Sequence, residues 1–361
     1  MTRPLLVELL LSPQRASQLS PADWDLLIRQ ARRANLIARL ATALEPQLDA
    51  LPNGPRQHLR SALLIARRQR IATRWEVECI RAALEPLGIR PILLKGAAYL
   101  LADLPAARGR LFGDVDLLVP KDQIEAAEAG LVAAGWAFDA ELSDYDQRYY
   151  RQWMHEIPPL YHQQRETALD LHHSILPPTA RVQVNTAALF EDARTLPELP
   201  GLQVLAPVTM FLHSAAHLFH EGELDHGLRD LFDLDALLRD FGRDTGFWTA
   251  LVPRAQVLGL VQPLFHALRY TTRLLETPVP VDVMRAAAQA AAGPRPLLDA
   301  CYDRALMPMH PSCDRPLTGI ARLALYVRSH WLRMPTVLLT QHLARKLWSR
   351  LLPPAAPRTG A

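Results

Sequence analysis

The sequence predicts an α+β fold in which a small mixed sheet is flanked by N-terminal and C-terminal helical regions. Apolar residues recur at helical spacing over residues 4–85 and again over 181–292. Between these regions, short apolar runs at 91–94, 114–119 and 168–172 have the length of strands and are bounded by Gly, Pro or polar residues. Hydrophobic residues make up 49% of the 361 residues, which is enough to bury a sizeable core.

Residues 1–86 form the predicted N-terminal helical region. Ser20 followed by Pro21 has the pattern of a helix start, with Ser at the N-cap and Pro in the first turn. Pro52-Asn53-Gly54-Pro55 indicates a break, and a long helix is expected over 56–86, ending at Leu87-Gly88. Its expected outer face is rich in arginine: Arg60, Arg67, Arg68, Arg70 and Arg74.

Residues 87–180 form the predicted sheet-containing core. Strand 91–94 leads into a turn at Lys95-Gly96, and a helix of small residues follows over 97–102. A strand over 114–119 and a helix over 121–134 come next, and then an aromatic and charged segment at 136–156. Further strands are expected over 157–162 and 168–172.

Two carboxylates lie two residues apart in the strand 114–119. Because side chains alternate along a strand, Asp114 and Asp116 share one face while Val115 points the other way. Two carboxylates on one face repel each other unless a cation lies between them, and oxygen ligands of this kind suit Mg²⁺. This pair therefore predicts a divalent metal site.

The order of these features resembles a known superfamily. Leu94-Lys95-Gly96, then Arg110-x-x-x-Asp114-x-Asp116-Leu-Leu-Val, and later Leu-Asp170-Leu-His172 are similar to the polymerase-β-like nucleotidyltransferase superfamily. Within it, the pattern looks like a large bacterial branch known only as a nucleotidyltransferase family. At the loop where the superfamily usually has Gly-Ser, this sequence has Lys95-Gly96. That difference fits the branch, and it leaves the way in which the nucleotide is bound less well defined.

The resemblance implies a third metal-binding carboxylate, Asp170, beside Asp114 and Asp116, and two Mg²⁺ ions. It further implies that His172 belongs to the site, although a buried core histidine is an equal alternative. Lys95 and Arg110 are the candidate cations for the nucleotide phosphates, and the backbone after Gly96 is expected to approach them closely. A surface position for Lys95 and a structural ion pair for Arg110 are the alternatives.

Residues 181–292 are predicted to be a helical domain. His213 and His217 lie four residues apart on one helix, and Arg229 precedes Asp233 by four on the next. A transition-metal site lacks an evident third ligand, so a polar face packed on the core is the plainer interpretation. The resemblance implies that His217, Arg229 and Asp233 either line the nucleotide side of the cleft or lock the helical domain against it.

Charge is unevenly distributed along the chain. Residues 1–75 hold 12 Lys/Arg against 5 Asp/Glu, residues 76–314 hold 20 against 32, and residues 315–361 hold 8 against none. Basic ends suit an anionic partner, although solvated helix faces, or ends folded over the acidic middle, would give the same pattern. Residues 293–352 are expected to form a basic helical region, including Arg328–Pro335 and a helix through His342 and Trp348, and 353–361 a disordered tail.

Several classes of protein are excluded by composition. The three cysteines, Cys79, Cys301 and Cys313, form no Cys-x-x-Cys pair, so neither a zinc ribbon nor a disulfide framework is predicted. No signal sequence is expected, and no run of about 18 apolar residues predicts a membrane span. We therefore expect a cytoplasmic protein.

Together these observations predict a Mg²⁺-dependent nucleotidyltransferase that moves a nucleoside monophosphate from an NTP such as ATP to a hydroxyl group. The acceptor can be a small molecule, a glycan intermediate, a peptide or an RNA. One alternative is a member that resembles toxin–antitoxin enzymes and modifies tRNA or a protein partner. Another is a non-catalytic scaffold that keeps the fold.

Overall fold

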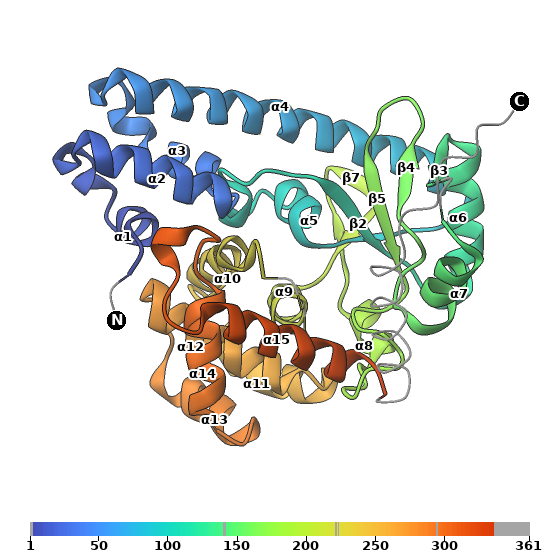
Figure 1. Ribbon diagram of the computed structural model, residues 1–361. Coiled ribbons are helices and arrows are strands. Elements are labelled where there is room, and N and C mark those ends of the chain that lie inside the picture. Colours follow the sequence, from blue (N-terminus) through green and yellow to red (C-terminus); the bar gives the residue numbers. More distant parts are fainter. Residues whose placement is uncertain (1–2, 140–141, 221, 223, 294, 336–361) are drawn as a thin grey trace, which may run out of the picture.

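The α+β prediction is confirmed by the computed structural model of the chain, which describes residues 3–139, 142–220, 222, 224–293 and 295–335 (Figure 1). The helices are α1 (Leu5–Leu11), α2 (Pro21–Arg33), α3 (Ile37–Leu44), α4 (Asn53–Leu84), α5 (Lys95–Leu101), α6 (Ile124–Ala133), α7 (Asp144–Trp153), α8 (Thr186–Glu191), α9 (Pro207–His220), α10 (Gly227–Phe241), α11 (Thr245–Leu258), α12 (Val261–Leu275), α13 (Val281–Ala290), α14 (Pro296–Ala305) and α15 (Thr318–Arg333). The strands are β1 (Ile92–Leu93), β2 (Asp114–Leu118), β3 (Trp136–Phe138), β4 (Leu160–His162), β5 (Ala168–His172), β6 (Arg194–Leu196) and β7 (Leu199–Val204).

Within these residues the strands form one mixed sheet in the order β3-β4-β5-β2-β1-β7-β6. Strand β2 lies at its centre, parallel to β5 and antiparallel to β1. The register between β2 and β5 places Asp116 opposite Asp170 and Leu118 opposite His172. The two strands that carry the predicted carboxylates are therefore neighbours in the sheet.

Three strands of the sheet differ from the sequence prediction. The segment 181–292 was predicted to be helical, whereas β6 and β7 form a hairpin whose second strand runs parallel to β1. Strand β3 forms within the aromatic segment after Gly135 and pairs with β4. Strands of three to six residues carry too few alternations for a pattern of period two to stand out.

The N-terminal region follows the predicted helix starts with one correction. Ser20 caps α2 as predicted, because its side chain accepts a hydrogen bond from the Asp23 backbone N–H and Asp23 reciprocates. Helix α4, however, begins at Asn53, so the predicted break at 52–55 is wrong in its extent. Pro55 lies in the first turn, where a backbone N–H has no partner within the helix, so its missing N–H costs nothing there.

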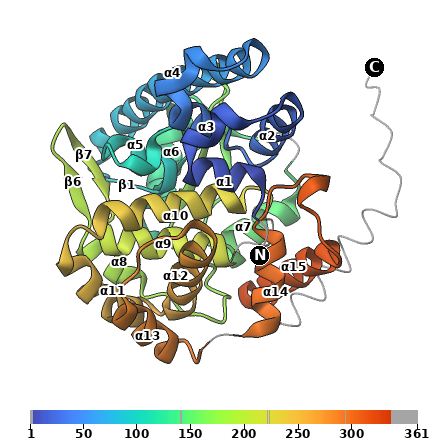
Figure 2. The same ribbon diagram turned by 90° about the vertical axis from the view of Figure 1, so that its left-hand side faces the viewer.

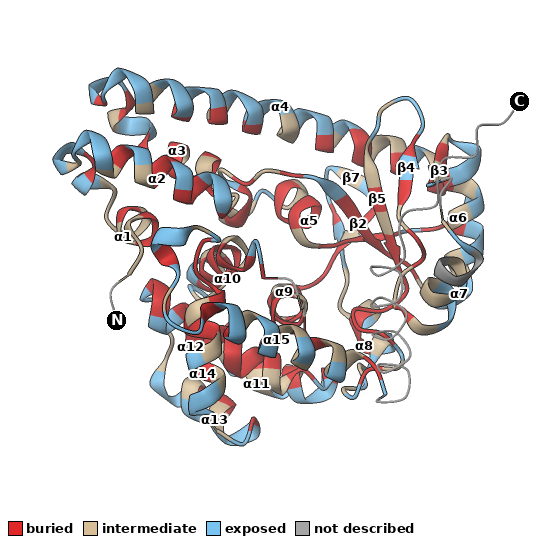
Figure 3. Ribbon diagram, viewed as in Figure 1, coloured by how far each residue is buried: buried red, intermediate tan, exposed pale blue. Residues whose placement is uncertain are grey.

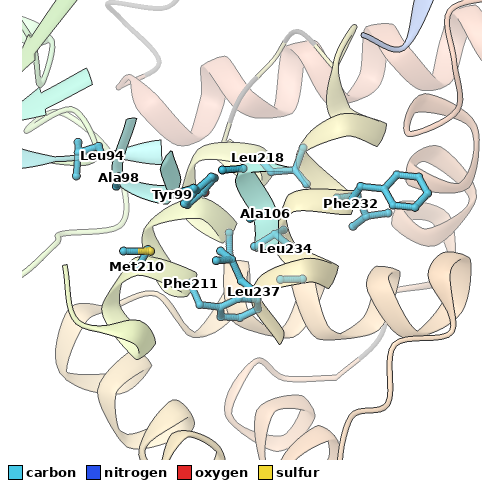
Figure 4. Close-up of a cluster of buried hydrophobic side chains, with 14 of the residues drawn as sticks. Leu94, Ala98, Tyr99, Ala106, Met210, Phe211, Leu218, Phe232, Leu234 and Leu237 are labelled. Atoms are coloured by element: carbon cyan, nitrogen blue, oxygen red, sulfur yellow. The ribbon is translucent and has the colours of Figure 1, made fainter. Parts of the chain in front are cut away.

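Helices lie above and below the interior of the molecule as it is drawn in Figure 1. Helix α4 runs across the top of the molecule, the sheet lies to one side, and α11–α14 form the opposite face (Figures 1 and 2). Helices α5, α9 and α10 meet in the interior, where side chains from all three form one apolar cluster (Figure 4). The labelled members include Ala98, Tyr99, Phe211, Leu218 and Leu237, all of them buried.

Helix α4 buries one face and exposes the other along most of its length (Figure 3). Leu59, Ala62, Ala66 and Val77 are buried against the core. The opposite face carries exposed apolar side chains next to arginines: Leu64, Ile65, Arg67, Arg68, Ile71 and Trp75.

One buried histidine makes the stability of the fold sensitive to acid. His266 is enclosed by the rings of Phe219, Tyr270 and Tyr302, and neither ring nitrogen has a hydrogen-bond partner within the described structure. Burial, together with the positive charge of Arg328, lowers the pKa of His266 to about 3. At pH values below about 6.5, the ordinary pKa of histidine, the unfolded chain binds a proton at this residue that the folded protein does not bind.

We therefore expect stability to fall as the pH drops from about 6.5 towards 3. Between pH 7 and 5, His266 should account for a loss of about 2 kcal/mol in the free energy of unfolding. Urea titrations at both pH values should show this loss for the unaltered protein and a smaller one for His266→Phe. Equal losses in the two proteins would contradict a neutral, buried His266.

The C-terminal region is described only as far as Pro335. Residues 296–333 contain α14 and α15, as expected for a helical region. The helix predicted through His342 and Trp348 and the tail predicted over 353–361 lie outside the described residues. Among the described helices, none combines the length and the apolar character that crossing a membrane requires.

Candidate active site

The candidate site is built on the adjacent strands β2 and β5. Asp116 and Asp170 occupy paired register positions, and the next position on the same face of β5 is His172. Ligand atoms of Asp116, Asp170 and His172 lie within 4.8 Å of one another. Parallel pairing therefore brings together two acidic groups that are 54 residues apart in sequence.

Asp116 is the most enclosed carboxylate of the group, with 3% of the residue exposed. Its Oδ1 accepts a hydrogen bond from Lys95 Nζ at 2.6 Å, and His172 Nε2 lies 3.2 Å from the same atom. Burial alone would raise the pKa of Asp116, but Lys95 and His172 outweigh it and hold that pKa well below its ordinary value. Asp116 is therefore ionised across the physiological range.

Lys95 is held in an uncommon backbone conformation. Its φ is +46°, in the left-handed region that residues with a side chain seldom adopt. The conformation lies at the junction of β1 and α5 and directs the ammonium to Asp116. Burial opposes the charge of Lys95, but Asp116, followed by Asp114 and Glu156, raises its pKa above the ordinary value. Strained backbone of this kind is concentrated at functional sites.

The negative charges of the other two predicted carboxylates, Asp114 and Asp170, are less fully offset by neighbouring positive charges. Repulsion by Asp116, followed by burial, raises the pKa of Asp114, which lies at the exposed start of β2. Burial, followed by the charge of Asp116, raises the pKa of Asp170 to about 7. Lys95, with smaller contributions from Arg110 and Arg229, lowers the pKa of Asp114, and His172 lowers that of Asp170, yet the net shift of both is upward. Carboxylates whose negative charge is incompletely offset favour a bound cation.

Two residues at this site were not predicted from the sequence. Glu156 Oε2 lies 3.2 Å from His172 Nδ1, and His155 Nε2 lies 3.9 Å from the same oxygen. Both residues come from the segment after α7, which runs antiparallel to the end of β5. Their only sequence signal is a His-Glu pair that precedes an apolar stretch, which is too common to single them out.

These side chains surround a cavity of about 220 Å³. Of the predicted site residues, Lys95, Asp114, Asp170, His172 and His217 line it. The remaining wall comes from the segment before β4, the loop after β5, α9 and the end of α15: Met154, His155, Glu156, Ile175, Leu176, Pro177, Ala216, His220 and Arg333. The cavity therefore lies between the sheet and the helical region.

Arg110, Asp233 and Arg229 do not line this cavity. Asp233 is buried on α10 and accepts from Arg110 Nε at 2.9 Å and from Arg39 Nη2 at 2.5 Å. This ion triad joins α3, the loop before β2 and α10, which is the locking arrangement that the sequence left as an alternative for Asp233. Arg229 donates to its neighbour Asp230 at 2.7 and 2.8 Å. Phosphate binding by Arg110 or Arg229 remains a prediction.

Gly96 lies directly beneath the Arg110 guanidinium. A Cβ added at Gly96 would be 2.3 Å from Arg110 Nη1 and 3.2 Å from Phe112 Cδ1. Because Asp233 fixes this guanidinium, the group cannot move aside without breaking the ion triad. Packing against Arg110 therefore requires glycine at position 96, whether or not the backbone there binds phosphate.

We expect Gly96→Ala to lower the free energy of unfolding by about 1–3 kcal/mol, the usual cost of overpacking. Urea denaturation measures the change. Gly54→Ala provides a matched control, because nothing lies within 4 Å of a Cβ added at Gly54 in α4. A Gly96→Ala protein as stable as the Gly54→Ala protein would refute the packing requirement.

His213 and His217 lie on α9 behind the carboxylates. Burial, followed by the charge of Lys95, lowers the pKa of His213 to about 3 and that of His217 well below its ordinary value. His213 is buried and its Nδ1 has no hydrogen-bond partner among the described residues. Both histidines are therefore neutral at pH 7, and only His217 reaches the cavity.

One comparison with known proteins finds a family for the chain. A family model described as "Uncharacterised nucleotidyltransferase" matches residues 20–276, which is well over half of the chain and includes both carboxylate strands. Neither the curated proteins nor the solved structures contain a match.

Proposed function

The chain belongs to this nucleotidyltransferase family, and from that premise we propose that it transfers a nucleoside monophosphate from an NTP to a hydroxyl group with the help of divalent metal ions. The observation that carries the proposal is the side-by-side placement of Asp116 and Asp170 on parallel strands. The shortage of compensating charge at Asp114 and Asp170 suits Mg²⁺, which prefers carboxylate oxygens and retains sites for phosphate and water.

Asp114, Asp116 and Asp170 would hold the metal ions. When bound, such ions neutralise the phosphate charge and activate the attacking hydroxyl. Lys95 already touches Asp116 and faces the cavity, so it can turn from the carboxylate towards the NTP phosphates as the cation arrives. Asp170 would accept the proton of the acceptor hydroxyl, and in-line attack at the α-phosphate would release pyrophosphate.

Calorimetric titration with ATP, CTP, GTP and UTP in the presence of Mg²⁺ tests this proposal. At least one NTP should bind in a Mg²⁺-dependent manner, and Asp114→Ala/Asp116→Ala should abolish that dependence. Absence of Mg²⁺-dependent binding for all four NTPs would instead favour a scaffold that keeps the fold.

An anionic macromolecule such as tRNA is a second candidate acceptor, favoured by the exposed face of α4. Residues 50–75 contain no Asp or Glu, while Arg68 and Trp75 are exposed on that face. Arginines interleaved with aromatic and apolar side chains suit nucleic-acid binding. Arg67 is already paired with Glu45, which reduces the positive charge that this face of α4 can offer to an anionic partner.

Measuring the transfer of labelled NMP to tRNA and to small metabolites separates the two classes of acceptor. Arg68→Glu should weaken only the transfer to tRNA.

A further inference from the structure

Beside the carboxylate pair, two histidines and a glutamate converge on a second point of the same cavity. Ligand atoms of His155, Glu156 and His172 all lie within 4.8 Å of one another. In a tetrahedral zinc site with N and O ligands, such atoms are about 3.3 Å apart. The two contacts to Glu156 Oε2, at 3.2 and 3.9 Å, are close to that spacing.

Backbone hydrogen bonds fix the two chain segments that provide these ligands. The N–H of His173 donates to the carbonyl of His155 at 2.8 Å, and the N–H of Ile157 donates to the carbonyl of Leu171 at 3.0 Å. Glu156 and His172 occupy the bridged position between these bonds. The three side chains therefore start from a rigid frame, and only side-chain rotation is needed to bring their ligand atoms together.

Both ring nitrogens of His172 lie 3.2 Å from a carboxylate oxygen, Nδ1 from Glu156 and Nε2 from Asp116, so a metal bound at Nδ1 would take the place of the proton between His172 and Glu156. An ionised carboxylate can only accept a hydrogen bond, so Nε2 carries a proton that it donates to Asp116. A carboxylate that receives the far N–H of a histidine is the usual second-shell partner of a metal-binding imidazole. In His155, Nε2 is the nitrogen that lies 3.9 Å from Glu156 Oε2, while the buried Nδ1 has no hydrogen-bond partner in the described structure.

We propose that His155, Glu156 and His172 form a site for a borderline divalent transition metal of the Zn²⁺ type, separate from the oxygen-only carboxylate site. Two histidines and one glutamate are a ligand set of catalytic zinc sites, in which a fourth position stays open. His155, Glu156 and His172 line the same cavity as Asp114 and Asp170. The proposal does not rest on nucleotidyl transfer, since it concerns different ligand atoms and a different class of metal.

Co²⁺ is the probe, added to chelator-treated full-length protein in excess Mg²⁺, with visible absorption and calorimetry as the readouts. Excess Mg²⁺ occupies oxygen sites and competes poorly for imidazole. Co²⁺ should bind the unaltered protein and the matched control Asp170→Asn alike. His155→Ala and Glu156→Gln should weaken binding at least about tenfold.

Two results would overturn the site. One is no Co²⁺ binding by the unaltered protein, and the other is equal affinity and absorption in the His155→Ala and Glu156→Gln proteins. Circular dichroism verifies the fold of each variant. Should His155→Ala not fold, His155→Gln retains the size and polarity of the side chain while removing the imidazole, and the same two outcomes apply to it.

Discussion

Replacing Asp116 by Asn is expected to lower nucleotidyl transfer by about 10²–10³-fold, the range seen when one group that stabilises transition-state charge is removed. Asn keeps the shape of the side chain but loses the charge that holds Lys95 and would hold the metal. Rates of labelled-NMP transfer at saturating Mg²⁺ measure the change. The loss should appear in kcat, because the missing interaction acts on the reacting phosphate.

Asp235→Asn is the matched control for this substitution. Asp235 is also a buried carboxylate in an ion pair, with Arg239 at 2.7 Å, but it lies on α10 rather than on the paired strands β2 and β5 that carry the predicted carboxylates. Its substitution should leave transfer close to that of the unaltered protein. Equal losses in the two variants would mean that any buried charge on the fold matters as much as Asp116, and the assigned role would fail.

Asp233→Ala is expected to destabilise the fold by about 3–5 kcal/mol, because it removes the carboxylate with which the buried Arg110 and the partly buried Arg39 are both paired. Asp233 is 3% exposed and forms ion pairs with both Arg39 and Arg110. A protein of ordinary stability, about 5–15 kcal/mol, would lose a large part of it. Urea denaturation at pH 7 measures the effect.

An exposed pair provides the comparison for Asp233. Asp49 pairs with Arg60 at 2.6 Å, yet its side chain is 88% exposed, so Asp49→Ala should cost no more than about 1 kcal/mol. If the large effect arises from uncompensated charge, Arg39→Met/Arg110→Met in the Asp233→Ala background should recover stability. No recovery would assign the loss to packing instead.

The carboxylate site could be predicted largely because its information is local. Asp114 and Asp116 share a face through strand alternation alone, whereas Asp170 and His172 were assigned to the site by the resemblance of the later Leu-Asp-Leu-His segment to the superfamily. The resemblance implied that Asp170 lies beside Asp114 and Asp116, and in the register of β2 with β5 it lies opposite Asp116; the parallel direction of the two strands was not predicted. Ser20 at the start of α2 is predictable for the same reason, because a capping box spans only four residues.

The features that sequence reasoning missed depend on distant contacts. Arg39 and Asp233 are 194 residues apart, so no pattern in either segment indicates their ion pair. Glu156 and His155 reach the site only because their segment adds to the end of β5, a pairing set by tertiary structure. The β6–β7 hairpin lies in a short stretch with prolines at 197 and 200, which weaken a strand signal.

Paired reactions with α-labelled and γ-labelled NTP in host extract test the central claim most directly. Nucleotidyl transfer predicts an acceptor that carries the α label but not the γ label, with the γ label released in pyrophosphate. The labelled acceptor should be absent without a divalent metal and in the Asp116→Asn protein. An acceptor that carries the γ label, or α labelling that persists in Asp116→Asn, would contradict the account.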